Sequence, residues 1–206
     1  MTGLWERMFA ERQLMWGNEP TLSALLARDA FAAAGARKVL VPGAGYGRNA
    51  KVFVDAGMDV TGIEISETAI GLARSGLGLH IRMHHGSVTD MPFDDDRYDG
   101  IFCFGLLYLL DAEGRAKHIA DCHRQLAPGG TMMFTVIAKE APMYQQGVQL
   151  GEDWYEVHPG ISMYFYDAGS IVRDFGGYGL VSQEPIVEPV AKDVAFPFIN
   201  VICRNG

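Results

Sequence analysis

A glycine-rich stretch at residues 39–47, Val-Leu-Val-Pro-Gly-Ala-Gly-Tyr-Gly, has the composition of a nucleotide-type binding turn. Its first three residues are apolar and predict a short buried strand that Pro42 ends, and residues 48–56 have the apolar spacing of a helix. Glycine lacks a Cβ, so the three glycines allow a sharp turn and give a ligand access to main-chain N–H groups. A strand, a glycine turn and a helix together predict a site for a nucleotide-like ligand.

Two ligand classes compete for this turn. A dinucleotide site has the spacing G-x-G-x-x-G, whereas the third glycine here is Gly47 and Arg48 takes the place that the dinucleotide pattern gives to glycine. Glu64 ends the next predicted strand, and a carboxylate there can accept hydrogen bonds from both hydroxyls of a ribose, as any adenosine ligand requires. The spacing disfavours a dinucleotide, and Glu64 favours an adenosine ligand of another kind.

Four segments resemble the class I S-adenosylmethionine-dependent methyltransferases in order and spacing, over about residues 38–138. They are the stretch at 39–47, Gly-Ile-Glu-Ile-Ser at 62–66, Met-Pro-Phe at 91–93 with Tyr-Asp at 98–99, and Leu-Ala-Pro-Gly-Gly at 126–130. The segment Trp-Gly-Asn-Glu-Pro at 16–20 is similar to the start of a small-molecule subgroup with thiopurine- and tellurite-type members. The resemblance implies a Rossmann-like fold, S-adenosyl-L-methionine as cofactor and a small-molecule methyl acceptor.

The resemblance also assigns a cofactor site. The predicted cofactor-binding residues are Trp16, Gly43, Ala44, Gly45, Glu64, Ile65, Ser87, Val88, Phe104 and Gly105. Glu64 would hold the ribose hydroxyls and Ile65 would pack on the adenine. Members of the family commonly carry an Asp where this chain has Ser87, so the adenine edge would meet Ser87 or, three residues further on, Asp90.

Methyl transfer from a sulfonium is a direct displacement of an already activated methyl group, so orientation and desolvation can supply most of the rate. A general base helps only if the acceptor is a hydroxyl or a protonated amine. The candidates for such a base are Tyr108, Tyr144, His158, Tyr164 and Tyr166, each of which can equally be a packing residue. No metal is predicted, because His84 and His85 are adjacent on a strand and would point to opposite faces. The run of three aspartates at 94–96 predicts a solvated turn.

The bulk composition limits the possible partners and location. The 206 residues carry a formal net charge of -8, which argues against a nucleic-acid binder. The three cysteines form no C-x-x-C pair, the start of the chain lacks the apolar segment of a signal peptide, and the longest apolar run is too short to span a membrane. We therefore expect a cytoplasmic protein without a membrane partner; the oligomeric state stays open.

Alternating strand and helix patterns predict a doubly wound α/β sheet of seven strands, mostly parallel, with the last strand antiparallel. We expect one domain in four parts: N-terminal helices at 1–37, a cofactor-binding core at 38–138, a substrate cover at 139–166 without regular structure, and a final helix with a terminal hairpin at 167–206. The predicted activity is metal-independent methyl transfer from S-adenosylmethionine. The alternatives are an NAD-dependent oxidoreductase and a non-catalytic protein that binds the cofactor.

Overall fold

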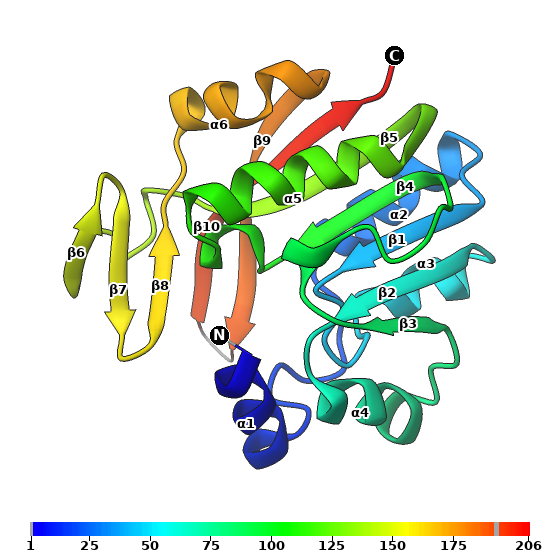
Figure 1. Ribbon diagram of the computed structural model, residues 1–206, viewed down its shortest axis with the longest axis horizontal. Helices are drawn as coiled ribbons and strands as arrows, with labels where there is room; N and C mark the ends of the chain where they lie inside the picture. The colour runs from blue at the N-terminus through cyan, green and yellow to red at the C-terminus, as the bar shows by residue number, and fades with distance from the viewer. Residues whose placement is uncertain (1, 192–193) are drawn as a thin grey trace.

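A seven-stranded sheet with the order β3-β2-β1-β4-β5-β10-β9 forms the centre of the computed structural model, which describes residues 2–191 and 194–206 (Figure 1). Its strands are β1 (Lys38–Pro42), β2 (Asp59–Glu64), β3 (Arg82–His85), β4 (Tyr98–Phe104), β5 (Leu126–Ile137), β9 (Leu180–Ala191) and β10 (Val194–Arg204). β10 runs antiparallel to both of its neighbours, β5 and β9. The strands β3, β2, β1, β4 and β5 are parallel to one another. This arrangement confirms the predicted sheet with its antiparallel last strand.

Helices cover both faces of this sheet (Figure 1). They are α1 (Thr2–Arg12), α2 (Leu22–Ala33), α3 (Ala50–Asp55), α4 (Glu67–Leu77), α5 (Ala112–Gln125) and α6 (Ala168–Phe175), with short 3₁₀ turns η1 (Val88–Asp90), η2 (Leu107–Leu109) and η3 (Gly176–Tyr178). The side chains of Ser66 and Asp111 cap α4 and α5, since each accepts a hydrogen bond from the first turn of its helix. None of the helices in the described ranges is long and apolar enough to cross a membrane.

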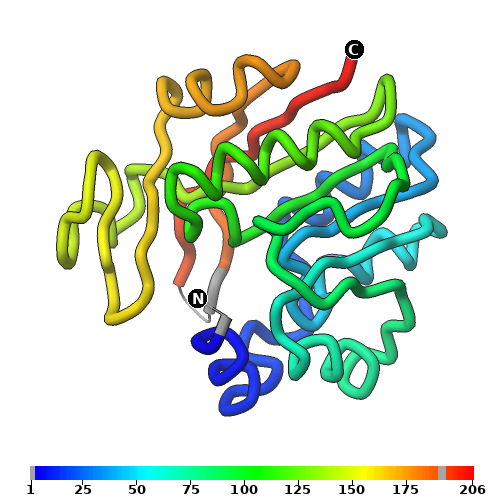
Figure 2. Tube along the Cα trace, in the orientation of Figure 1, coloured from blue at the N-terminus to red at the C-terminus, as the bar shows by residue number. Residues whose placement is uncertain are grey.

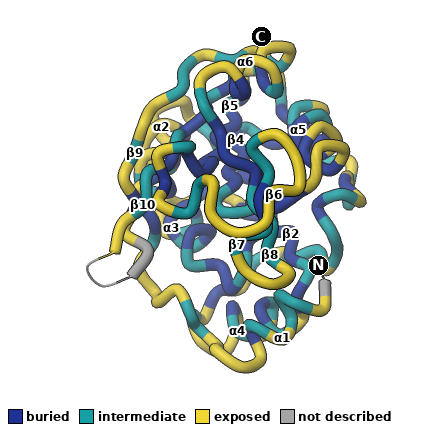
Figure 3. The backbone as a smooth tube through the Cα atoms, turned by 90° about the vertical axis from the view of Figure 1, so that its left-hand side faces the viewer, coloured by how far each residue is buried: buried dark blue, intermediate teal, exposed yellow. Residues whose placement is uncertain are grey.

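The central strands are buried on both sides, as their unbroken apolar runs predict. Along β1, Leu40 belongs to the core under α5 and α6, whereas Val39 and Val41 belong to the core under α2 and α3. β4 does the same, with Ile101 in one core and Phe102 in the other. Figure 3 shows β4 in dark blue, the colour of buried residues.

The segment 139–166, expected without regular structure, instead contains a three-stranded antiparallel sheet of β6 (Val148–Gly151), β7 (Trp154–His158) and β8 (Ile161–Tyr164). This part of the prediction was wrong. The strands are only four or five residues long and are paired through turns, with Asp153 and Gly160 at positive φ. Pairing between neighbouring strands therefore decides the structure of this segment more than its local composition does.

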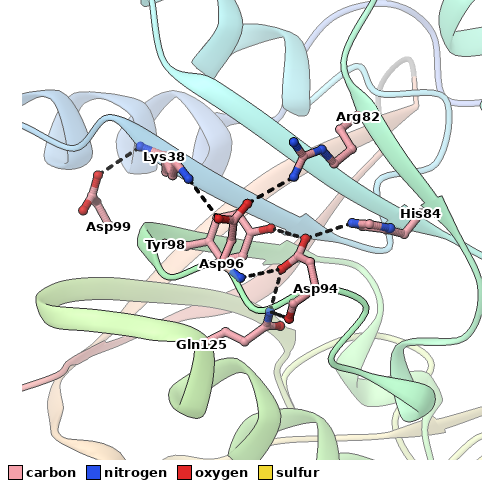
Figure 4. A network of polar contacts seen from close by, with 8 residues as sticks. All are labelled: Lys38, Arg82, His84, Asp94, Asp96, Tyr98, Asp99 and Gln125. Carbon is pink, nitrogen blue, oxygen red and sulfur yellow. Dashed lines mark hydrogen bonds and ion pairs between the residues drawn. The ribbon is translucent and has the colours of Figure 1, made fainter.

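The aspartates at 94–96 are not a freely solvated turn, which corrects a second expectation. Asp94 accepts hydrogen bonds from the Tyr98 hydroxyl (2.8 Å) and the Gln125 amide (3.1 Å), and it lies 2.9 Å from Nε2 of His84 (Figure 4). Asp96 pairs with Lys38 of β1 at 3.0 Å and with Arg82 of β3 at 3.1 Å. The loop thus ties β1, β3, β4 and α5 together at the amino ends of β1 and β4.

Candidate functional site

A cavity of about 770 Å³ opens at the carboxyl ends of the parallel strands, between the neighbouring strands β1 and β4. The helices that follow these two strands, α3 and α5, cover opposite faces of the sheet. All ten residues predicted to bind the cofactor line this cavity. The ends of β1, β2 and β4, the loop before η1 and the N-terminal segment bring them together although they are spread over residues 16–105. Their roles as ligand contacts stay predictions, but all ten lie around the same cavity.

The glycine turn forms the floor of this cavity. Gly43 has a φ of +67° and Gly45 a φ of +56°, a region that residues with a Cβ rarely adopt. A Cβ on Gly43 would come 2.9 Å from Cδ2 of Leu106, whereas a Cβ on Gly45 would meet nothing closer than 3.7 Å. The chain therefore leaves room above Gly45 for a ligand. Gly47 does not line the cavity; a Cβ there would overlap the Leu79 side chain, so this glycine serves the packing of the turn.

Glu64 stands at the centre of the wall, at the end of β2. Its Oε1 accepts hydrogen bonds from the N–H groups of Ile65 and Ser66, both at 2.9 Å, and its Oε2 accepts one from the N–H of Gly45 at 2.7 Å. Burial raises the pKa of this carboxyl, and the three backbone hydrogen bonds oppose that rise in pKa. A carboxylate offers about four acceptor sites, so Oε2 keeps one for a hydroxyl of a ligand.

The sequence left open whether Ser87 or Asp90 would meet the adenine edge, and the two residues lie differently relative to the cavity. Ser87 and Val88 line the cavity, whereas Asp90 is exposed and does not. Ser87 Oγ lies 2.7 Å from Oγ1 of Thr89 and accepts a hydrogen bond from the Thr89 N–H at 3.2 Å. Thr89 also lines the cavity and was not predicted; its position in a Ser-x-Thr turn was the only local signal for it.

The N-terminal segment closes one side of the cavity with Trp5, Phe9 and Trp16, of which only Trp16 was predicted. The Tyr46 hydroxyl donates to the carbonyl of Gly17 at 2.7 Å and accepts from the N–H of Trp16 at 3.0 Å. Residues 16 and 17 are therefore fastened directly to the glycine turn.

Two further contacts hold this segment in place. Nη1 of Arg48, the residue that breaks the dinucleotide spacing, donates to the carbonyls of Trp16 (2.9 Å) and Glu19 (3.2 Å). Glu6 of α1 accepts hydrogen bonds from the Ser66 hydroxyl (2.6 Å) and the Thr68 hydroxyl at the start of α4. Figure 2 shows α1, in blue, beside α4. The hydroxyls of Ser66 and Thr68 lower the pKa of Glu6, so its carboxyl is ionised at neutral pH.

The opposite end of the cavity is apolar and aromatic. Phe104 and Phe198 lie 5.6 Å apart between ring centroids, and Tyr108 lies 6.2 Å from Phe198. Met143 and Met163 of the segment 139–166 line the same end. Burial raises the pKa of Tyr108, so its hydroxyl keeps its proton at neutral pH.

Of the five candidates for a general base, Tyr108 lines the cavity, and the other four lie outside its described lining. Neighbouring residues of a strand point to opposite faces, so Met163 faces the cavity while the ring of Tyr164 lies 3.8 Å from the Arg115 guanidinium outside it. The hydroxyl of Tyr144 donates to Asp153 at 2.7 Å.

The remaining two candidates lie elsewhere for equally simple reasons. Tyr166 is fully buried and its hydroxyl donates to Asp174 at 3.3 Å. His158 is exposed at the end of β7. The position of His158 follows from the small sheet of β6, β7 and β8, which the sequence did not predict. Tyr166 lies outside that sheet and forms an isolated bridge with Ala138.

Comparisons with known proteins agree with this architecture. A family model described as a methyltransferase domain matches residues 39–130. The ubiquinone biosynthesis O-methyltransferase of Aromatoleum aromaticum is 30% identical over 112 residues, which cover 52% of this chain and 47% of that protein. The demethylmenaquinone methyltransferase of Clavibacter sepedonicus is 28% identical over 125 residues, covering 59% of this chain and 50% of that protein. The chain spans about half the length of these curated relatives.

Solved structures match over nearly the whole chain. The 1,6-didemethyltoxoflavin-N1-methyltransferase of Burkholderia thailandensis, solved with 1,6-didemethyltoxoflavin and S-adenosylhomocysteine, superposes with a TM-score of 0.76 at 18% identity, covering 99% of this chain and 86% of that one. The methyltransferase CcbJ of Streptomyces caelestis gives a TM-score of 0.73 at 18% identity, covering 98% of both chains. The chain therefore has the fold of these methyltransferase structures, and its residues 39–130 match a methyltransferase domain.

Proposed function

We propose that this chain is an enzyme that transfers the methyl group of S-adenosylmethionine to a small-molecule acceptor. The observation that carries the proposal is the position of the Glu64 carboxylate beside the open glycine turn, with one acceptor site free on Oε2. A buried carboxylate next to a floor without side chains suits a ribose, because a ribose hydroxyl can donate to it while the sugar lies flat on the turn.

The remaining wall suits the other parts of this cofactor. Ile65 and Val88 offer apolar contact for an adenine ring, and Ser87 and Thr89 offer hydroxyls near its edge. Phe104 would border the end where the acceptor enters. When bound, S-adenosylmethionine supplies a methyl group that its sulfonium has already activated.

The side chains of the chain itself would bind, orient and desolvate the reactants. Glu64 would fix the ribose and hence the direction of the methyl group, while the apolar end would exclude water from the reacting atoms. Met143 and Met163 support a cover role for the segment 139–166, since both line the cavity. The free, buried cysteines suit a reducing compartment such as the cytoplasm.

Calorimetric titration with S-adenosylmethionine, S-adenosylhomocysteine and NAD tests the proposal. We expect both sulfur ligands to bind and NAD to bind far more weakly. Glu64→Ala should weaken binding by more than about tenfold, the loss expected when a charged hydrogen-bond partner is removed. Glu67→Ala, in an exposed residue three positions away, is the matched control and should leave the affinity unchanged.

Three outcomes would count against parts of this proposal. Binding of NAD without either sulfur ligand would favour the oxidoreductase. Binding of the sulfur ligands without methyl transfer to any compound of a broad acceptor panel would favour a non-catalytic cofactor-binding protein. An unchanged affinity in Glu64→Ala would show that the ribose assignment is wrong.

A further inference from the structure

We propose that the methyl acceptor is an aromatic compound that attacks through an ionised hydroxyl or thiol, and that the Tyr108 hydroxyl donates a hydrogen bond to the attacking atom. This inference rests on the proposed methyl transfer and names the substrate class of the same cavity. It is carried by the walls of the apolar end, by the positions of the polar groups and by the environment of one hydroxyl.

The walls of the apolar end fit a flat ring. Phe104, Tyr108 and Phe198 form a continuous aromatic cluster, with Phe198 at 5.6 Å from Phe104 and 6.2 Å from Tyr108. Methionines 143 and 163 line the cavity at this end as well. Aromatic rings and thioethers make favourable contacts with an aromatic ring.

The two described carboxylates of the wall are engaged by backbone N–H groups. Glu64 accepts three of them, beside the glycine turn. Asp111 caps α5 by accepting a hydrogen bond from the N–H of Gly114 at 2.8 Å. A Cβ on Gly114 would come 3.5 Å from Cγ2 of Thr89, so the first turn of α5 lies near η1. An acceptor that loses its proton without the help of these groups therefore fits the site.

Tyr108 is the polar group that does face the apolar end. The residue is 8% exposed and lines the cavity, and no hydrogen bond joins its hydroxyl to the described residues. That hydroxyl lies beside Gly105, where a Cβ would be 3.8 Å away. A buried hydroxyl gains most from an ionised partner, because charge-assisted hydrogen bonds are the strong ones.

The reaction balances without a further reactant. A lone pair of the ionised oxygen or sulfur forms the new bond to the methyl carbon as the carbon–sulfur bond of the cofactor breaks, and that bond's electron pair stays on the sulfur. The anion and the sulfonium are thereby neutralised together. Tyr108 keeps its proton throughout and holds the attacking atom in line.

Binding of two chromogenic probes, 4-nitrophenol and 4-nitrothiophenol, tests this inference without methyl transfer. Their absorbance distinguishes ionised from neutral forms, so titrations at pH values above and below each ionisation give both affinities. We expect Tyr108→Phe to weaken binding of the ionised forms by about tenfold or more and of the neutral forms by much less. Tyr178→Phe, which removes a hydroxyl outside the cavity, should change neither affinity.

The outcomes separate this inference from the proposed function. Titration of S-adenosylhomocysteine into the same samples reports the cofactor site, and absence of its binding would count against the function itself. If S-adenosylhomocysteine binds while neither probe does, or while Tyr108→Phe leaves the ionised probes unaffected, the acceptor inference is overturned alone. Thermal melting controls for folding; loss of an unpartnered hydroxyl should leave the melting temperature unchanged.

Discussion

Glu64 shows how one residue joins the fold to the ligand. Its carboxylate terminates β2 and organises the chain around it, because it accepts N–H groups from both the glycine turn and the start of α4. Burial outweighs these hydrogen bonds and raises the pKa of the carboxyl above its usual value. A ligand that donates a further hydrogen bond to the ionised form would lower this pKa again.

A pH dependence of cofactor binding follows from this balance. The ionised form of Glu64 accepts hydrogen bonds, and the protonated form becomes a donor, so affinity should fall as the pH drops toward and through the raised pKa. We expect the dissociation constant for S-adenosylhomocysteine to start rising, as the pH falls, above the usual Glu pKa of about 4.3. Calorimetry at several pH values measures it. Glu64→Gln cannot titrate and should give weaker binding with a flatter profile; equal pH profiles for both proteins would contradict the prediction.

The N-terminal segment is the element whose role was least visible in the sequence. Helix α1 and residues 13–20 supply Trp5, Phe9 and Trp16 to the cavity, and Tyr46 and Arg48 of the glycine turn hold them there. Arg48 thus has a positive role that the glycine spacing alone did not reveal. Because residues 16 and 17 are hydrogen-bonded to Tyr46 and Arg48, the position of this side of the cavity depends on the conformation of the glycine turn.

Tyr46→Phe tests this coupling. The substitution removes the hydroxyl that bonds to Trp16 and Gly17 while keeping the ring that packs edge-on against Phe9. We expect a loss of about 1 kcal/mol in the free energy of unfolding and faster hydrogen exchange at residues 13–20. Binding of S-adenosylhomocysteine should weaken several-fold, because the bound state must now order this wall. Tyr178→Phe serves again as control, and unchanged exchange at residues 13–20 would show that the segment is held by packing alone.

The sequence predicted what local patterns determine. Apolar runs with flanking glycines predicted the strands β1 and β2. The carboxyl ends of neighbouring parallel strands meet at one edge of the sheet, so the sequence could place Gly43, Glu64 and Phe104 in one site. Phe198 could not be placed in this way, because its position depends on the register of β10 against β5, which pairs Phe198 with Ile137. The side on which Tyr164 lies depended in the same way on unpredicted strand pairing.

At the scale of the whole molecule, the binding end and the opposite end of the sheet have different tasks. The cavity end leaves the Tyr108 hydroxyl and one acceptor site of Glu64 free for ligands. At the opposite end, by contrast, protein groups donate hydrogen bonds to the Asp94 carboxylate (Figure 4). Burial opposes ionisation of Asp94, but the hydrogen bonds from Tyr98, His84 and the N–H of Asp96 together lower its pKa. The loop that precedes β4 is therefore held by an ionised group far from the ligand.

Asp94→Asn should consequently reduce stability without affecting binding. A carboxyl with a lowered pKa stabilises the fold above its unfolded pKa of about 3.9, and that contribution is lost as the pH falls through the folded value. We expect a loss of about 1–3 kcal/mol at neutral pH, from weakened hydrogen bonds to a charged group, which shrinks as the pH falls below the usual Asp pKa of about 3.9 and through the lowered folded pKa. Urea unfolding at neutral and at acid pH measures this difference, and titration with S-adenosylhomocysteine should give the wild-type affinity. Asp95→Asn, in the exposed neighbour, is the matched control; if both variants lose the same stability, the loop is sensitive to charge in general and the network around Asp94 does not hold it.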